Sequence, residues 1–278
     1  MKMSHFSKLK IITTSAISKA RYCLRQLTLH EQLLLTPTAP RNDDLYLVSF
    51  PKSGTTWVNF LVANINAMMS NQVRKVTYYN INDFVPDIHL SRSLPDPSLP
   101  FPGFRFIKSH SVLNIYYCNV VYIIRDPRDT LLSYYHFTSK LGLYSGSLSD
   151  FLKHKEFGIH AWVRHVNSWF NLSPASLNFM FLKYEDLKEN PQDELTRLYS
   201  QLGFDLPQLI LDSSILKSSF ANMKLLEQSL NYGSRSTLSK FNFMRKGNVG
   251  DGLVAFSQND LNYIEKYAGD AMSKFGYV

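Results

Sequence analysis

Short apolar runs alternate with stretches of helical periodicity along most of this chain, and no other feature of the sequence restricts the fold as strongly. The apolar runs cover residues 45–50, 104–108, 120–124 and 178–182, and the helical stretches cover residues 55–69, 127–139, 158–171, 191–203 and 259–275. Strands that alternate with helices predict a central parallel β-sheet flanked by helices on both faces. We expect a single α/β domain, because 278 residues with 45% hydrophobic content can bury one sizeable core.

An unusual loop joins the first apolar run to the first helical stretch. Residues 50–57 read "FPKSGTTW", in which Lys52 precedes the loop's only glycine, Gly54. A Walker A loop places its lysine after the second of two glycines. The first backbone N–H groups of a helix point into such a turn, so we expect a P-loop-like strand–loop–helix that binds an anion in a different way. A plain turn with a buried tryptophan is the alternative, but it leaves the lysine and the two threonines unexplained.

Basic and imidazole side chains follow two further apolar runs. Lys108 and His110 stand at the end of "RFIKSH", and Arg125 follows "VVYII". The carboxyl ends of parallel strands meet at one edge of a sheet, and ligands of such folds bind there. We therefore expect these three side chains to open on the same side of the sheet as the loop at 51–56.

Taken in order along the chain, these segments resemble the motifs of sulfotransferases that use 3′-phosphoadenosine 5′-phosphosulfate (PAPS), of the cytosolic and bacterial type. "FPKSGTTW" is similar to that family's 5′-phosphosulfate loop, and "KSH" to its K-x-H motif. "YIIRDPRDTLLSYYHF" resembles its 3′-phosphate strand and helix. "FLKYEDLKENP" resembles its Y-E-D segment, and "FMRKGNVGD" its C-terminal R-K-G-x-x-G-D loop. The resemblance extends from about residue 44 to residue 275.

The resemblance implies roles for particular residues. His110 would take a proton from the acceptor, Lys52 would neutralise charge on the bridging oxygen, and Lys108 would lie near the sulfuryl oxygens. PAPS would be the cosubstrate and adenosine 3′,5′-bisphosphate (PAP) its product, with no metal required. The residues implied to hold the nucleotide are Lys52, Ser53, Gly54, Thr55, Thr56 and Trp57 in the loop, Arg125, Ser133, Arg245, Lys246 and Gly247 at the 3′-phosphate, and Tyr184, Ser218 and Phe220 at the adenine.

The implied reaction is sulfuryl transfer to a hydroxyl or amine of a small acceptor. We expect an apolar or phenolic acceptor, with a lipid or sugar kept open, because aromatic residues lie near the motifs. These aromatic residues are Tyr116, Tyr117, Tyr134, Phe137, Tyr144 and Trp162. Each of them could equally belong to the hydrophobic core. His136 and His160 compete with His110 on composition, but neither follows a strand end, and we expect packing or pocket-lining roles for both.

Two other classes of function compete with this interpretation. The first is a P-loop-like nucleotide kinase or NTPase, which would need an acidic strand end to hold Mg²⁺, and Asp126 is the one candidate. The second is a non-catalytic nucleotide-binding protein of the same fold, which an intact K-x-H motif argues against.

A basic tail over residues 1–38 precedes the domain, which we expect to span residues 39–278. Six Lys and Arg residues fall within residues 1–30 with no acid among them, and without these six the net charge drops from +8 to +2. A nearly neutral domain argues against a nucleic-acid partner. The tail fits a helix packed on the domain, a peripheral membrane contact by residues 1–30 or an organelle transit peptide. We expect a cytoplasmic location, with the last two as alternatives.

The C-terminal loop departs from the family pattern. Gly252 and Leu253 stand where the family usually has Trp and Lys, and the "TV" of its short dimer motif is missing from "VAFSQND". This argues against a dimer of the family's type and leaves the oligomeric state open. Cys23 and Cys118 are too few for a disulfide framework or a zinc site.

Overall fold

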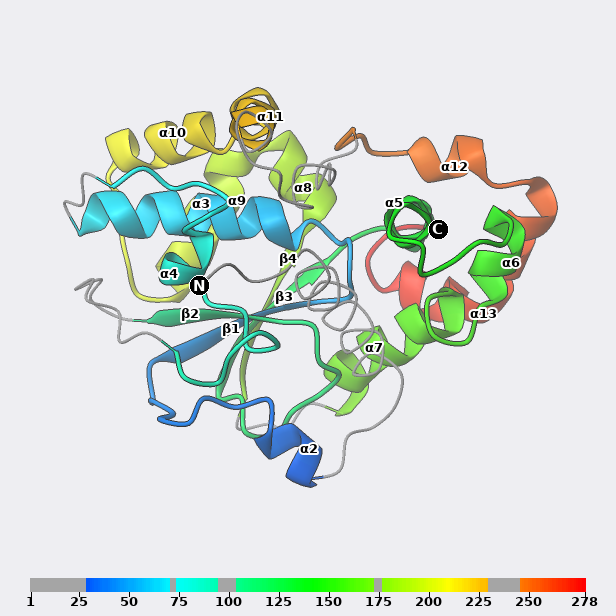
Figure 1. Ribbon diagram of the computed structural model, residues 1–278, viewed down its shortest axis with the longest axis horizontal. Coiled ribbons are helices and arrows are strands. Elements are labelled where there is room, and N and C mark those ends of the chain that lie inside the picture. The colour runs from blue at the N-terminus through cyan, green and yellow to red at the C-terminus, as the bar shows by residue number, and fades with distance from the viewer. Residues whose placement is uncertain (1–28, 71–73, 95–103, 173–176, 230–245) are drawn as a thin grey trace, which may run out of the picture.

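The computed structural model describes residues 29–70, 74–94, 104–172, 177–229 and 246–278. Within these residues the chain forms a four-stranded, fully parallel sheet in the order β2-β1-β3-β4 (Figure 1). The strands are β1 Asp44–Ser49, β2 Arg105–Ser109, β3 Asn119–Ile124 and β4 Asn178–Lys183. In the register, Leu45 pairs with Phe106 on one side and with Asn119 on the other. The predicted parallel α/β sheet is confirmed.

Helices connect and cover the strands. They are α2 Leu29–Leu33, α3 Thr55–Met69, α4 Ile81–Phe84, α5 Pro127–Lys140, α6 Leu148–Lys153, α7 Ile159–Leu172, α8 Tyr184–Glu189, α9 Pro191–Gln201, α10 Gln208–Lys217, α11 Phe220–Ser229, α12 Asp251–Ala255 and α13 Gln258–Ser273. The predicted helical stretches correspond to α3, α5, α7, α9 and α13. The short helices α6, α8 and α12 were not among the predicted helical stretches. They have only five or six residues each.

Alternate side chains of each strand belong to two different cores, one on each face of the sheet. In β1, Tyr46 and Val48 join a core with residues of α5, α6, α7 and α13, whereas Leu45 and Leu47 join a core with residues of α3 and α9. In Figure 1, α3, α10 and α11 accordingly lie on the opposite side of the sheet from α7 and α13. Because both faces are covered, the strands are continuous apolar runs in the sequence.

The parallel order brings the carboxyl ends of all the strands to one edge of the sheet. The loop before α3 follows β1, His110 follows β2, Arg125 follows β3 and Tyr184 follows β4. Lys108, expected just past a strand, lies inside β2, which extends one residue further than predicted. The edge where the sequence analysis expected a ligand therefore carries chemically active side chains from every strand of the sheet.

The predicted tail lies mostly outside the described residues, which begin at residue 29. The last part of this segment contacts the domain, since Asn114 donates a hydrogen bond to the carbonyl of Gln32 at 2.8 Å and Tyr117 donates one to the carbonyl of Leu35 at 2.8 Å. Along the described part of the chain, no helix combines the length and the apolar character that crossing a membrane requires.

Candidate active site

The loop between β1 and α3 is shaped by two residues in the left-handed region. Lys52 has φ 72° and Gly54 has φ 99°. Gly54 also lies against the ring of Tyr184, because a Cβ at position 54 would fall 2.4 Å from Tyr184 Cδ2. A lysine in this conformation is uncommon, and such residues are found where the surrounding structure imposes them. The loop is therefore held in one shape by β1, by α3 and by the first residue of α8.

His110 is buried at the end of β2, and its tautomer follows from its hydrogen bonds. Its Nδ1 lies 2.8 Å from the carbonyl oxygen of Ser49. Since a carbonyl only accepts, Nδ1 carries the proton and the basic lone pair belongs to Nε2. The backbone on either side is also held: the N–H of His110 donates to His89 Nε2 at 2.8 Å, and His165 Nε2 donates to the carbonyl of His110 at 3.3 Å.

Lys108 is positioned by an acidic residue from outside the sheet. Its Nζ lies 3.0 Å from Asp87 Oδ2, and the Asp87 side chain is 2% exposed. The backbone around Asp87 runs alongside β2, because the N–H of Lys108 donates to Pro86 and the carbonyl of Lys108 accepts from Ile88. A buried carboxylate with an ammonium partner fixes the direction of that ammonium.

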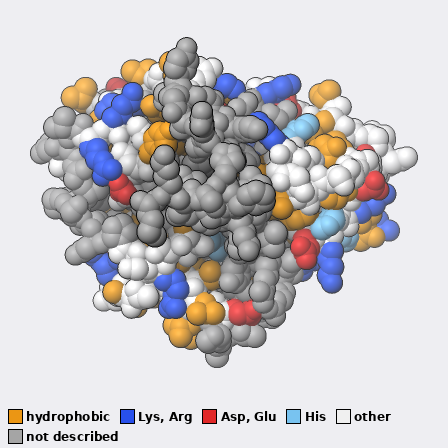
Figure 2. All heavy atoms as spheres, in the orientation of Figure 1, with side chains coloured by type: hydrophobic (Ala, Val, Ile, Leu, Met, Phe, Trp, Pro, Cys, Tyr) orange, Lys and Arg blue, Asp and Glu red, His pale blue; other side chains and the backbone are white. Residues whose placement is uncertain are grey.

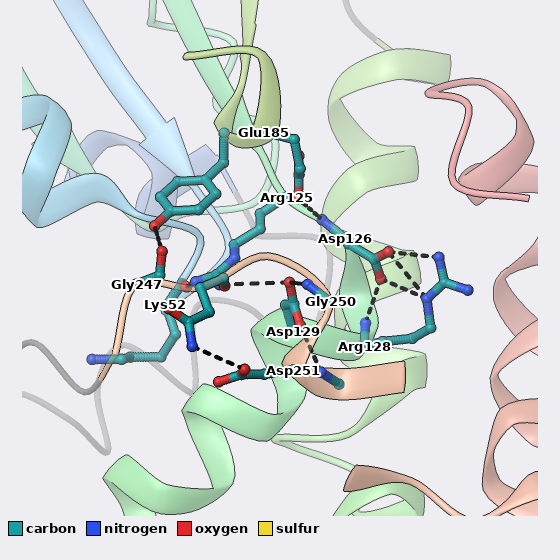
Figure 3. A network of polar contacts seen from close by, with 12 residues as sticks. Lys52, Arg125, Asp126, Arg128, Asp129, Glu185, Gly247, Gly250 and Asp251 are labelled. Atoms are coloured by element: carbon teal, nitrogen blue, oxygen red, sulfur yellow. Dashed lines mark hydrogen bonds and ion pairs between the residues drawn. The ribbon is translucent and has the colours of Figure 1, made fainter. Parts of the chain in front are cut away.

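Arg125 extends from β3 between Tyr184 and the C-terminal loop (Figure 3). Its guanidinium carbon lies 4.2 Å from the centroid of the Tyr184 ring. Its Nη2 donates to the carbonyl of Asn248 at 2.8 Å and lies 3.7 Å from Asp129 Oδ2. Tyr184 in turn donates to the carbonyl of Gly247 at 3.3 Å, and burial raises the pKa of its hydroxyl. Tyr184 is therefore neutral at ordinary pH and acts as a donor and an aromatic surface.

Asp129 holds the C-terminal loop on α5. Its Oδ2 accepts from the N–H of Gly250 at 2.9 Å and its Oδ1 from the N–H of Gly252 at 2.7 Å (Figure 3). Gly252 packs so closely that a Cβ there would fall 2.4 Å from the carbonyl carbon of Arg128. A larger residue at 252 cannot occupy this position without moving α5. The departure from the family pattern at Gly252 thus has a packing reason.

A single cavity brings these side chains together. It is lined by Pro51, Lys52, Gly54, Thr55, Thr56, Trp57, Lys108, His110, Arg125, Ser133, Phe137, Tyr184, Phe220 and Gly247. Most of the residues implied by the resemblance are therefore neighbours in space. Pro51 was not among them, although its place inside the loop could have indicated it.

Three of the implied nucleotide residues do not line the cavity, and a fourth is not described. Ser53 is buried within the loop and does not line the cavity. Ser218 is also buried and its Oγ accepts a hydrogen bond from Asn64 Nδ2 at 3.1 Å. Lys246 is exposed and does not line the cavity, and Arg245 lies outside the described residues.

Among the six aromatic residues proposed as pocket lining, Phe137 is the one that lines this cavity. Its ring lies 4.4 Å from Lys52 Nζ. Tyr117, Tyr134 and Trp162 are buried in the core, Tyr116 is exposed, and Tyr144 packs on Phe151. Tyr117, Tyr134 and Trp162 are therefore core residues, the alternative that the sequence had left open for them.

The competing histidines lie away from the cavity. His160 shares a 3.0 Å hydrogen bond with the Tyr263 hydroxyl, and His136 is exposed on α5. Neither lines the cavity that holds His110.

Asp126, the acidic strand end that a kinase would need, is engaged in capping α5. Its Oδ1 accepts from the N–H of Arg128 at 2.8 Å, and its Oδ2 pairs with the Arg128 guanidinium at 2.6 Å. The hydrogen bonds that Arg128 donates to Asp126 also raise the pKa of the Arg128 guanidinium, which therefore stays charged. In the portion of the chain that the structure describes, no group of three or more His, Cys, Asp or Glu side chains is arranged to hold a metal ion.

Comparison with known proteins identifies the family. A family model described as the sulfotransferase domain matches residues 42–276. The chain belongs to the sulfotransferase family. This sulfotransferase is 31% identical over 256 residues to Sulfotransferase 1A1 of Bos taurus, covering 82% of this chain and 84% of that protein. It is 31% identical over 264 residues to Sulfotransferase 1C2 of Rattus norvegicus, covering 83% and 85%.

Solved structures agree with this assignment at the level of the fold. Mouse sulfotransferase SULT7A1 complexed with PAP matches with a TM-score of 0.63 and 21% identity, over 90% of this chain and 94% of that one. Retinol dehydratase in complex with androsterone and PAP matches with a TM-score of 0.60 and 20% identity, over 84% and 82%. The family model and the curated relatives confirm the predicted family and enzyme class, a PAPS-dependent sulfotransferase, and the solved structures confirm the fold.

Proposed function

We propose that this sulfotransferase transfers the sulfuryl group of PAPS to a hydroxyl or amine of a small apolar or phenolic acceptor. In this proposal His110 is the general base and no metal is required. The observation that carries it is the fixed tautomer of His110, whose Nδ1 proton is held by the Ser49 carbonyl at 2.8 Å in a residue that lines the cavity. This arrangement supports Nε2 as the atom that accepts the proton.

One buried donor supports an anionic nucleotide in the cavity. Arg125 lines the cavity, and its Nε has no hydrogen-bond acceptor among the described residues. Buried donors in folded proteins are almost always satisfied, and phosphate or sulfate oxygens are the acceptors that a guanidinium fork suits best. The residues present therefore fit the phosphates of PAPS, with Arg125 at the 3′-phosphate and the loop of Lys52, Ser53, Thr55 and Thr56 at the phosphosulfate. Trp57, Tyr184 and Phe220 supply aromatic surface for the adenine.

The bound PAPS supplies an activated sulfuryl group, and the protein supplies positions, charge and a base. Lys52 lies in the same loop as the phosphosulfate donors and is suited to neutralise charge on the bridging oxygen. Lys108, directed by Asp87, is suited to the sulfuryl oxygens. His110 takes the acceptor proton at Nε2, a role that suits a side chain whose reference pKa is about 6.5. A general base of this kind typically raises the reaction rate ~10²–10⁴-fold.

The acceptor class is supported by what surrounds the base. Phe137 and Pro51 line the same cavity as His110 and are apolar. Retinol dehydratase, which shares this fold, has been solved with retinol or androsterone beside PAP, and both are apolar alcohols. A small apolar alcohol or phenol that packs on Phe137 and presents its hydroxyl to His110 satisfies both observations.

Replacement of the base tests the proposal most directly. His110→Asn retains a donor near the position of Nδ1 and removes the basic Nε2, so we expect turnover to fall at least ~100-fold while the affinity for PAP changes less than ~3-fold. Turnover is measured with PAPS and a panel of phenols and alcohols, and PAP affinity by calorimetric titration. His160→Asn is the matched control and retains full activity, because His160 bonds Tyr263 away from the cavity.

The same titrations test the nucleotide. We expect PAP to bind more tightly than AMP and Mg-ATP and to bind equally well with EDTA. Preference for Mg-ATP would contradict the nucleotide assignment, and near-normal turnover of His110→Asn would remove His110 from the mechanism.

A further inference from the structure

Buried hydroxyls connect His110 to the phosphosulfate loop through Ser49. Ser49 is the last residue of β1 and is fully buried. Its Oγ lies 2.5 Å from Thr55 Oγ1 and 3.3 Å from His110 Nδ1, and its carbonyl oxygen lies 2.8 Å from the same Nδ1. Thr55 begins α3 and lines the cavity. One serine therefore touches both the base and the loop.

The direction of these hydrogen bonds follows from the tautomer of His110. Because the proton is on Nδ1, the Ser49 Oγ is an acceptor in this contact and shares the one Nδ1 proton with the closer Ser49 carbonyl. A hydroxyl has one proton to donate, and the neighbouring partner of Ser49 Oγ is Thr55 Oγ1 at 2.5 Å. Thr55 Oγ1 accepts the proton of the Ser49 hydroxyl. The proton of the Thr55 hydroxyl is then available to a group in the cavity that Thr55 lines. Every donor in the series then points from the imidazole toward the loop.

We propose that Ser49 is a positioning residue that couples anion binding in the loop to the orientation and basicity of His110. The proposal rests on the proposed function, because it uses His110 as the base and the loop as the phosphosulfate site. An anion that accepts from Thr55 polarises the hydroxyls in series, since hydrogen bonds in a chain strengthen one another. The bond at Nδ1 then becomes stronger and Nε2 becomes a better base. The nucleotide thus prepares the base before the acceptor reacts.

The other titratable and charged groups around His110 reach it without the Ser49 hydroxyl. His89 and His165 bond its backbone N–H and carbonyl. Lys52, Lys108 and Arg125 line the same cavity, and Asp87 pairs with Lys108. Their fields act on His110 whether or not position 49 carries a hydroxyl. Removal of this one oxygen therefore isolates the coupling from the general electrostatics of the cavity.

Ser49→Ala tests the coupling, with Ser111→Ala as the matched control. Ser111 is equally buried and follows His110 directly, but its Oγ bonds Ser109 Oγ at 3.0 Å rather than the imidazole. The pH at which the His110 imidazole titrates is followed by NMR with and without saturating PAP. We expect PAP to raise this pH in the wild type and in Ser111→Ala, and Ser49→Ala to lose at least half of the rise. The negative charge of PAP accounts for the remainder.

Kinetics give a second measure that a purely structural role does not move. We expect Ser49→Ala to lower kcat at least ~10-fold and to displace the acidic limb of its pH profile, with PAP affinity changed less than ~3-fold. Ser49→Thr restores the hydroxyl and is expected to recover the pH profile. Thr55→Val breaks the same series of hydrogen bonds at its other end. The double variant Ser49→Ala/Thr55→Val is therefore expected to lose no more of the PAP-induced rise in the His110 titration pH than the more affected single variant. If Ser49→Ala does not fold, Thr55→Val at saturating PAP carries the same measurement.

Two results separate failure of this inference from failure of the proposed function. A full PAP-induced rise and a normal pH profile in Ser49→Ala overturn the coupling, while loss of activity in His110→Asn leaves the proposed function intact. Normal turnover in His110→Asn removes His110 as the base of the proposed function, and with it any role for Ser49 in preparing that base.

Discussion

Gly54 meets two constraints on a single residue, and they have different physical origins. Its φ of 99° lies in a region that side chains with a Cβ rarely adopt, and the Cβ that any other residue would add falls 2.4 Å from the Tyr184 ring. In the sequence, Gly54 is the only glycine of the loop. The structure shows that it approaches Tyr184, which follows β4, two strands away from β1 in the sheet.

We predict that Gly54→Ala destabilises the protein and weakens PAP binding. Backbone strain and the contact with Tyr184 together cost about 2–4 kcal/mol of the free energy of unfolding. Relief of that contact displaces Tyr184, which lines the cavity, so PAP affinity falls at least ~10-fold, or ~1.4 kcal/mol. Urea unfolding and calorimetric titration measure the two effects.

Gly203→Ala is the control for this substitution. Gly203 has φ +83° but a Cβ there meets nothing within 4 Å. We expect a loss of about 1 kcal/mol from backbone strain alone and unchanged PAP affinity. Equal effects of the two substitutions on binding would show that the Tyr184 contact does not shape the site.

At the scale of elements, α5 does more than follow the strand that carries Arg125. Asp126 begins the helix as its N-cap, and Asp129 in its first turn accepts the N–H groups of Gly250 and Gly252. The C-terminal loop is thereby held against the same helix that follows Arg125. Arg125 and Gly247 both line the cavity, so the two sides of the proposed 3′-phosphate site are joined through one carboxylate.

We predict that Asp129→Asn loosens this loop. An amide has one oxygen to accept the two N–H groups and carries no charge, so at least one strong hydrogen bond is lost. We expect a loss of about 1–3 kcal/mol of stability and a fall of at least ~10-fold in PAP affinity. Thermal unfolding and calorimetric titration with PAP and AMP measure this, and the affinity for AMP, which lacks the 3′-phosphate, should change less.

Asp150→Asn provides a control on a different helix. Asp150 stands in the first turn of α6 and accepts a hydrogen bond from Ser147 on the surface. We expect a change of less than about 1 kcal/mol in stability and none in PAP binding. Unchanged PAP affinity in Asp129→Asn would show that the loop keeps its place without this carboxylate.

For the whole molecule, a buried histidine links the sheet, α7 and the site. His165 on α7 accepts from the Tyr122 hydroxyl of β3 at 2.7 Å and donates to the carbonyl of His110 at 3.3 Å. Burial lowers the pKa of His165 to about 3. The imidazole is therefore neutral in the folded state over the whole range in which an unfolded histidine takes up a proton.

We predict acid lability from this residue. Below pH ~6.5 the unfolded chain binds a proton at position 165 that the folded chain binds only near pH 3, so the free energy of unfolding falls as the pH falls through this window. The slope is at most about 1.4 kcal/mol per pH unit, or roughly 2–3 kcal/mol by pH ~4.5. Urea unfolding between pH ~7 and pH ~4.5, a range in which an unfolded histidine titrates, measures it.

His165→Gln should remove this part of the pH dependence, even though it lowers stability at neutral pH. The exposed His136→Gln on α5 is the control and should leave the slope unchanged. A slope in His165→Gln equal to that of the wild type would assign the acid lability to other groups.

The described part of the face drawn in Figure 2 is consistent with a nearly neutral domain. Figure 2 shows Lys and Arg side chains dispersed over the described part of one face, with Asp and Glu side chains among them. Three expectations stay predictions: that the protein has no nucleic-acid partner, that it is cytoplasmic, and that it does not form a dimer of the family's type. Residues 1–28, which hold most of the basic tail and its proposed membrane contact, lie outside the described residues.

The sequence by itself determined much of the local structure and indicated the family. Continuous apolar runs located each described strand and helical patterns located most of the longer described helices, because burial of a strand or of one helix face depends on residues that are close together in the sequence. The loop "FPKSGTTW" and the K-x-H motif indicated the family, because a strand–turn–helix that binds an anion needs particular residues at fixed short spacings. These features depend on neighbours along the chain.

Only the tertiary structure decided which distant residues meet. Asp129 and Gly250 are 121 positions apart, and Ser49 and His110 are 61 positions apart. Nothing in the local pattern separates Phe137, which lines the cavity, from Tyr134, which is buried one turn earlier. Such contacts depend on strand order and on the packing of helices across the sheet. Strand order and helix packing depend on all the buried surfaces of the domain together. A short segment of sequence therefore does not predict them.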